Sequence, residues 1–114
     1  DGDRDPSKRP AMAQVAAAGS DILVITDHHP RFEDPDSIRA GLEKSARESY
    51  PNHEIYNVSP PEAAIRKAVS LATTGDAILW AGPGHQDYRD IRGVRTPYSA
   101  RKEAREALKE HGWS

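Results

Sequence analysis

The stretch Ile22-Leu23-Val24-Ile25-Thr26-Asp27-His28-His29-Pro30-Arg31 joins a short apolar run to a string of polar and charged residues. A short β-branched run of this kind predicts a buried parallel strand, and the polar residues predict a loop at its carboxyl end. Ligands of α/β sheets bind in the crevice at the carboxyl ends of the strands. The stretch therefore predicts an α/β fold with a binding site at residues 26–31.

Helical and strand patterns alternate along the rest of the chain. We expect helices over residues 11–18, 34–48, 60–73 and 99–111 and strands at 22–26, 55–58 and 77–81. Residues 88–97, with Gly93 near the middle, suggest a small hairpin or an irregular excursion. Three helix starts carry capping signals, namely Asp34-Pro35, the capping box Ser59-Pro60-Pro61-Glu62, and Ser99. The alternation predicts a single α/β domain, a Rossmann-like three-layer sandwich with a mostly parallel sheet and flanking helices.

The composition narrows the class of protein. A chain of 114 residues is long enough for one domain, and 36% hydrophobic residues suffice for a modest core. The net charge of -2 gives no electrostatic basis for binding nucleic acid or an anionic membrane. The chain has no cysteine, which fits the cytoplasm, and no apolar run approaches the ~20 residues of a membrane span. We expect a cytoplasmic protein without nucleic-acid or membrane partners.

The first residues, Asp1-Gly2-Asp3-Arg4-Asp5, have the composition of a loop between two elements. We therefore expect the chain to be a piece of a longer protein. Arg4 can hold a carboxylate or phosphate through two parallel hydrogen bonds. Lys8-Arg9-Pro10 opens a helix, and a helix N-terminus favours anions. A solvated run of charges is the alternative for this segment.

The triplet Asp27-His28-His29 after an apolar strand suggests a metal site. It resembles the metal-binding motif of DHH-type phosphoesterases and exonucleases, and carboxylate and imidazole groups are suitable ligands for manganese or zinc. Such a site needs further aspartates from other strands, and the later strands offer no second aspartate motif. The metal-dependent phosphoesterase is therefore an alternative rather than our main prediction.

A second candidate loop, Gly82-Pro83-Gly84-His85-Gln86-Asp87-Tyr88, follows the strand predicted at residues 77–81. Its two glycines allow the backbone to come close to a ligand and to present bare N–H and C=O groups. A tight turn is the alternative. Because parallel strands end at the same edge, this loop is expected to face the same crevice as residues 26–31.

The three elements together resemble the C-terminal domain of the MurE-type Mur ligases, over nearly the whole chain. The resemblance rests on the order Gly-Asp-Arg-Asp, Lys-Arg-Pro, Thr-Asp-x-x-Pro-Arg-x-Glu-Asp-Pro and Gly-x-Gly-His-x-Asp-Tyr. These ligases add the third amino acid of the peptidoglycan stem to UDP-N-acetylmuramoyl-L-alanyl-D-glutamate. ATP converts a substrate carboxylate into an acyl phosphate, which the amine of the incoming amino acid then attacks.

The resemblance also implies what this chain lacks. In these ligases the sites for ATP and Mg2+ lie mostly on a central domain, and the uridine nucleotide lies on an N-terminal domain. In agreement, this chain has no phosphate-binding Gly-x-x-x-x-Gly-Lys-Ser/Thr loop. The C-terminal domain would begin with a strand ahead of Gly2, which this chain is expected to lack. We expect no catalytic residue in residues 1–114 and no ligation by this chain alone.

By resemblance, this domain selects the incoming amino acid. Arg4 and Arg31 would hold the carboxylate at the far end of a diaminopimelate side chain, and Gly82 would offer a backbone carbonyl to its far amino group. Two arginines on separate loops make a geometry-selective clamp that a lysine substrate would leave unsatisfied. Diaminopimelate is therefore favoured over lysine, ornithine or another diamino acid.

Several substrate-binding positions depart from the family pattern. The family's Asp-Asn-Pro-Arg appears here as His28-His29-Pro30-Arg31, and the family's glutamate for the distal ammonium is the neutral Gln86. Asp27, His85 and Tyr88 are further candidates for facing the ligand. A non-catalytic α/β binding domain that kept the fold and lost the site is the remaining alternative.

Overall fold

The structure of the chain is a computed structural model that describes residues 6–81 and 88–113. Along the chain, helices and strands follow one another in the order η1 (Pro6–Lys8), α1 (Arg9–Ala18), β1 (Ile22–Ile25), α2 (Pro35–Ser49), β2 (Glu54–Asn57), α3 (Pro61–Leu71), β3 (Tyr88–Ile91), β4 (Val94–Pro97) and α4 (Ala100–Glu110). The predicted alternation of helices and strands is confirmed for most of the chain.

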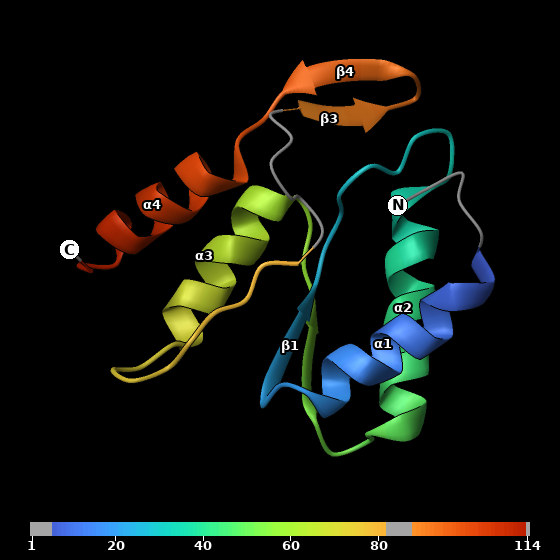
Figure 1. Cartoon of the computed structure of the whole chain (residues 1–114), viewed down its shortest axis with the longest axis horizontal. Coiled ribbons are helices and arrows are strands. Elements are labelled where there is room, and N and C mark those ends of the chain that lie inside the picture. The colour runs from blue at the N-terminus through green and yellow to red at the C-terminus, as the bar shows by residue number, and fades with distance from the viewer. Residues whose placement is uncertain (1–5, 82–87, 114) are drawn as a thin grey trace.

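A parallel pair of strands, β1 and β2, lies at the centre of the molecule. Helices α1 and α2 cover one face of this pair, and α3 covers the other with α4 packed on α3, so the domain has three layers (Figure 1). The register pairs Ile25 with Asn57, so the two strands end together and their following loops share one edge. The α/β sandwich is confirmed.

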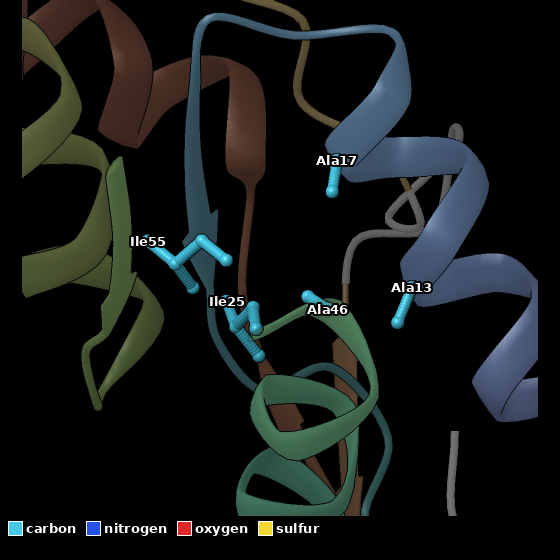
Figure 2. Close-up of a cluster of buried hydrophobic side chains, with 5 residues drawn as sticks. All are labelled: Ala13, Ala17, Ile25, Ala46 and Ile55. Atoms are coloured by element: carbon cyan, nitrogen blue, oxygen red, sulfur yellow. The ribbon is translucent and has the colours of Figure 1, made fainter. Parts of the chain in front are cut away.

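The main core lies between the central strands and the helices α1 and α2. Its buried side chains are Ala13 and Ala17 of α1, Ile25 of β1, Ala46 of α2 and Ile55 of β2 (Figure 2). Three of these five are alanines, whose small side chains allow the helix backbones to approach each other and the sheet closely. The alanine-rich sequence of α1 thus serves close packing.

Two of the predicted helix caps form. The carboxylate of Asp34 accepts a hydrogen bond from the backbone N–H of Asp36 at the start of α2, at 3.2 Å. The hydroxyl of Ser99 accepts one from the backbone N–H of Lys102 at the start of α4, at 3.3 Å. Each bond satisfies a donor that the first turn of a helix leaves unpaired.

The predicted capping box at Ser59 is wrong. The residue before α3 is Pro60, which has no capping side chain, and the hydroxyl of Ser59 instead donates to the carboxylate of Asp27 at 2.6 Å. Because α3 begins at Pro61, one residue later than the pattern predicts, Ser59 lies two residues ahead of the helix and its hydroxyl is not in the capping position.

The strand predicted at residues 77–81 is also absent from the described structure. No described residue pairs with this segment, and the side chain of Leu79 is 91% exposed. A strand forms through hydrogen bonds to a neighbour, which an apolar run does not supply by itself. Trp80 nevertheless packs against a second cluster made by Ile65, Val69 and Ala107. That this chain lacks a family strand expected ahead of Gly2 stays a prediction.

The predicted hairpin forms from β3 and β4, which pair antiparallel. Its two-residue turn is Arg92-Gly93, and both residues have positive φ, at 53° and 80°. Positive φ at both central positions is the backbone of a type I′ turn, which suits the twist of a hairpin. The hairpin stands at the edge where the central strands end (Figure 1).

Candidate functional site

The loop over residues 26–34, which leads from β1 to α2, lies against the β3–β4 hairpin. The backbone N–H of Arg31 donates to the carbonyl of Asp90 at 3.1 Å, and the N–H of Arg92 donates to the carbonyl of Arg31 at 2.7 Å. Arg31 and Ile91 form an isolated parallel bridge. The loop is therefore joined to the hairpin by main-chain bonds, at the carboxyl end of the central strands.

The side chain of His29 is the buried centre of this contact. Its relative exposure is 2%, and its Nδ1 accepts a hydrogen bond from the backbone N–H of Asp90 at 3.1 Å. The ring stacks on Tyr88 with centroids 5.4 Å apart, and the ring of His28 lies 3.7 Å from it. On the hairpin, the guanidinium of Arg95 lies over the Tyr88 ring at 4.6 Å. Both histidines thus belong to a stack of rings between loop and hairpin.

Arg31 adopts a backbone conformation that is unusual for its residue type. Its φ is 54°, in the left-handed region that residues with a Cβ rarely occupy. The two main-chain bonds to the hairpin hold it there. Strained residues of this kind are concentrated at functional sites, where the surrounding structure imposes the conformation.

The neighbour of Arg31 also contacts the hairpin. The ring of Phe32 lies against the turn glycine, with its Cζ only 3.1 Å from the position that a Cβ on Gly93 would take. The turn therefore requires glycine for its φ of 80°, and a Cβ there would also push the exposed Phe32 ring aside by a few tenths of an ångström.

The carboxylate of Asp27 is occupied by protein partners on both oxygens. Oδ1 accepts from Nη1 of Arg39, and Oδ2 accepts from the hydroxyl of Ser59. Among residues 6–81 and 88–113, no three His, Asp or Glu side chains form a group that could hold a metal ion. These contacts give Asp27 a structural role and do not favour the phosphoesterase alternative.

Arg39 is a buried charge that was not predicted from the sequence. Its side chain is 9% exposed and bonds the carboxylates of Asp27 and Asp36 and, at 2.8 Å, the amide oxygen of Asn57. Burial alone would lower the pKa of the Arg39 guanidinium, but the two carboxylates outweigh burial and the pKa is raised. The sequence did contain a signal for this burial. Asp27 follows one parallel strand and Asn57 ends the next, so their polar groups lie close together and face α2, which carries Arg39.

The other side of the hairpin is attached to the α3–α4 layer. Nη2 of Arg89 forms an ion pair with Oε1 of Glu62 at 3.1 Å, and the Arg89 guanidinium lies over the ring of Tyr98 at 4.4 Å. Burial, with the nearby Glu62 carboxylate, raises the pKa of Tyr98 to about 12. The hairpin therefore bridges the site loop and the second helical layer.

The start of α1 also reaches the site loop. Arg9 donates two hydrogen bonds to the two carboxylate oxygens of Glu33, each at 3.0 Å. Hydrogen bonding to Glu33 raises the pKa of the Arg9 guanidinium above its ordinary value. This two-pronged pair connects α1 to the loop.

The structure thus gathers five of the nine predicted site residues around the loop and hairpin, namely Asp27, His28, His29, Arg31 and Tyr88. Arg4, Gly82, His85 and Gln86 lie outside the described residues. Asp90 was not predicted from the sequence. It contributes through its backbone N–H and carbonyl, and side-chain identity does not indicate which backbone groups make such contacts.

Residues 1–84 match the family model described as Mur ligase, glutamate ligase domain. The chain belongs to this family. A solved structure titled as a UDP-N-acetylmuramoyl-L-alanyl-D-glutamate--2,6-diaminopimelate ligase superposes on this Mur ligase domain with a TM-score of 0.86 and 32% identity. The superposition covers 99% of this chain and 23% of the other.

Curated relatives of this Mur ligase domain have related names. The UDP-N-acetylmuramyl-tripeptide synthetase of Leifsonia xyli subsp. xyli is 55% identical over 99% of this chain and 22% of its own length. The 2,6-diaminopimelate ligases of Cytophaga hutchinsonii and Geobacillus kaustophilus are each 41% identical, over 94% and 97% of this chain and 22% of their own lengths. The chain thus spans about a fifth of the length of these relatives.

Within the described part of this Mur ligase domain, no helix has the length and apolar character needed to cross a membrane.

Proposed function

We propose that this Mur ligase domain selects the incoming amino acid for an ATP-dependent ligase acting on UDP-N-acetylmuramoyl-L-alanyl-D-glutamate. The observation that carries the proposal is the placement of Arg31. Its backbone is held on both sides by the hairpin, at the edge where ligands of α/β sheets bind. A guanidinium on a fixed backbone suits two-pronged recognition of a carboxylate.

We propose meso-diaminopimelate as the amino acid. It carries a second carboxylate at the far end of its side chain, for which Arg31, together with Arg4, would be the partner. Lysine and ornithine lack this carboxylate and could not form the same charged hydrogen bonds. Two of the relatives above are named for diaminopimelate, whereas the name of the Leifsonia relative specifies no amino acid.

In the proposed reaction, a substrate carboxylate is activated as an acyl phosphate, the amine of the amino acid attacks it, and phosphate leaves as the amide forms. As the family resemblance implies, ATP and Mg2+ would bind mostly on the central domain, and the uridine nucleotide on the N-terminal domain, of a longer, cytoplasmic ligase. The part of this chain is to orient the amino acid, which lowers the entropic cost of bringing amine and acyl group together.

The test is ligation by the full-length ligase that carries this domain, with UDP-N-acetylmuramoyl-dipeptide, ATP and Mg2+. Diaminopimelate, lysine and ornithine are supplied in turn, and the tripeptide product is measured. We expect the highest kcat/KM with diaminopimelate. A preference for lysine or ornithine would overturn the choice of amino acid, and an enzyme inert with all three would point to a non-catalytic binding domain.

A further inference from the structure

His29 lies at the candidate site, yet its side chain is only 2% exposed. The ring is covered by His28 on the loop and by Tyr88 on the hairpin, and its Nδ1 is bonded to the backbone of Asp90. An imidazole with so little exposed surface has almost none to offer a ligand, although its sequence position suggests direct contact with substrate.

We infer that His29 is a positioning residue, which acts on the amino acid through Arg31 by fixing the β3–β4 hairpin against the loop. The inference rests on the proposed function of Arg31. It changes the role expected for His29 from contact with the substrate to support of the residue that makes the contact.

The link between the two side chains is the peptide backbone at Asp90. The N–H of Asp90 donates to Nδ1 of His29, and its carbonyl accepts from the N–H of Arg31 at 3.1 Å. One hairpin residue therefore binds both loop residues. A shift of the Asp90 backbone would change the position of Arg31 directly.

Arg31 depends on this support because its φ of 54° is unfavourable for a residue with a Cβ. If the hairpin moved away, nothing in the local sequence would favour this conformation, and the loop would relax toward negative φ. A relaxed backbone would change the direction in which the Arg31 side chain leaves the loop. Misplacing a binding group by about 1 Å is enough to cost up to about a hundredfold in rate.

The chemistry of the acceptor explains which replacements should be tolerated. Because Nδ1 accepts the bond from Asp90, this nitrogen carries no proton in the described arrangement. The Oδ1 of an asparagine occupies a similar place relative to the backbone and also accepts, whereas leucine fills the space and leaves the Asp90 N–H without its acceptor. His29→Asn and His29→Leu therefore separate the hydrogen bond from the bulk of the ring.

The experiment measures KM for diaminopimelate in the full-length ligase for His29→Leu, His29→Asn, Arg31→Ala and the double variant His29→Leu/Arg31→Ala. We expect His29→Leu to raise this KM about tenfold or more, to leave KM for ATP and for the uridine nucleotide substrate unchanged, and to be largely rescued by His29→Asn. In the Arg31→Ala background, His29→Leu should add less than about twofold, because residues that act through one another are not additive.

Additive effects of His29→Leu and Arg31→Ala, or an unchanged KM in His29→Leu, would overturn the inference while leaving the role of Arg31 intact. An unchanged KM in Arg31→Ala would overturn the proposed function of Arg31 and the inference with it.

A second variant covers the case in which His29→Leu does not fold. Gly93→Ala strains the hairpin at its turn, because Gly93 has a φ of 80°, and its Cβ would also press on the Phe32 ring of the loop at 3.1 Å. It should raise the same KM, again only when Arg31 is present. Gly41→Ala on α2, where the Cβ meets nothing within 4 Å, is the matched control and should leave KM unchanged. A KM unaffected by Gly93→Ala would contradict the inference.

Discussion

The imidazole of His29 accepts a hydrogen bond through Nδ1 from the backbone N–H of Asp90, with the two atoms 3.1 Å apart and the residues 61 positions apart in sequence. This bond connects the loop after β1 to the β3–β4 hairpin. The hairpin is attached in turn to α3 by the ion pair between Arg89 and Glu62. The candidate site is therefore assembled by contacts between segments that are distant in the sequence.

The bond from Asp90 to His29 should protect the Asp90 amide from hydrogen exchange. In the chain with His29→Leu, we expect this amide to exchange about tenfold faster, which corresponds to losing one net hydrogen bond. The amide of Val58 donates to the carbonyl of Ile25 at 2.9 Å, away from His29, and should keep its protection. Unchanged exchange at Asp90 would show that His29 does not hold the hairpin.

The pair formed by Asp27 and Arg39 should behave as a buried ion pair. Removing only the cation, as in Arg39→Met, leaves the carboxylate of Asp27, which is 13% exposed, without its charged partner, and should lower the free energy of unfolding by about 3 kcal/mol. The double variant Asp27→Asn/Arg39→Met should recover part of that loss. Urea denaturation measures both, and a double variant no more stable than Arg39→Met would contradict the account.

The same substitution should have opposite effects at two glycines. Gly93→Ala places a Cβ at a φ of 80° and 3.1 Å from the Phe32 ring, and should destabilise the chain by about 1 kcal/mol or more. Gly41→Ala lies within α2 in open space and should stabilise it by up to about 1 kcal/mol. Thermal unfolding of the two variants gives the signs, and a stabilised Gly93→Ala chain would exclude the described turn.

The sequence predicted those parts of the fold that local patterns determine. Asp34 and Ser99 cap their helices as expected, because each cap needs only an oxygen and a nearby N–H. Gly93 marks the hairpin turn because few other residues adopt its φ. The apolar run Ile22–Ile25 predicted the parallel strand and, through its direction, the edge at which the site lies, but of its four residues only Ile25 is buried.

The failed predictions involve partners far away in the sequence. Ser59 bonds Asp27 instead of capping α3, and residues 77–81 have no described neighbour to pair with. Arg39 is buried because three polar groups from α2 and the two strand ends converge on it. Local periodicity contains no information about such convergence. The positions of Asp27 and Asn57 at the strand ends were the available signal for Arg39, and no such signal indicated the docking of the hairpin.

Tyr98 should give the chain a specific alkaline pH dependence. Its hydroxyl is buried without a hydrogen-bond partner among the described residues, and burial raises its pKa from 10.0 to about 12. Because the unfolded chain releases this proton first, the contribution of neutral Tyr98 to the free energy of unfolding is full below pH 10. It is lost as the pH rises toward 12, with a slope of at most about 1.4 kcal/mol per pH unit.

The Tyr98→Phe variant isolates this effect, since all other titrating groups are common to both chains. The stability of the wild-type chain should fall more steeply than that of Tyr98→Phe between pH 10 and 12. At pH 7 the two should differ by less than about 1 kcal/mol, because the buried hydroxyl makes no bond that is lost. Parallel pH profiles in urea denaturation would contradict the assignment.

The central claim is that Arg31 binds the distal carboxylate of the incoming amino acid. The most direct measurement is kcat/KM of the full-length ligase for diaminopimelate and for lysine, with and without Arg31→Ala. We predict that Arg31→Ala lowers kcat/KM for diaminopimelate by about 10- to 100-fold, the value of a hydrogen bond between charged groups, and changes the value for lysine by less than about twofold. An equal loss for both amino acids, or no loss for diaminopimelate, would contradict the claim.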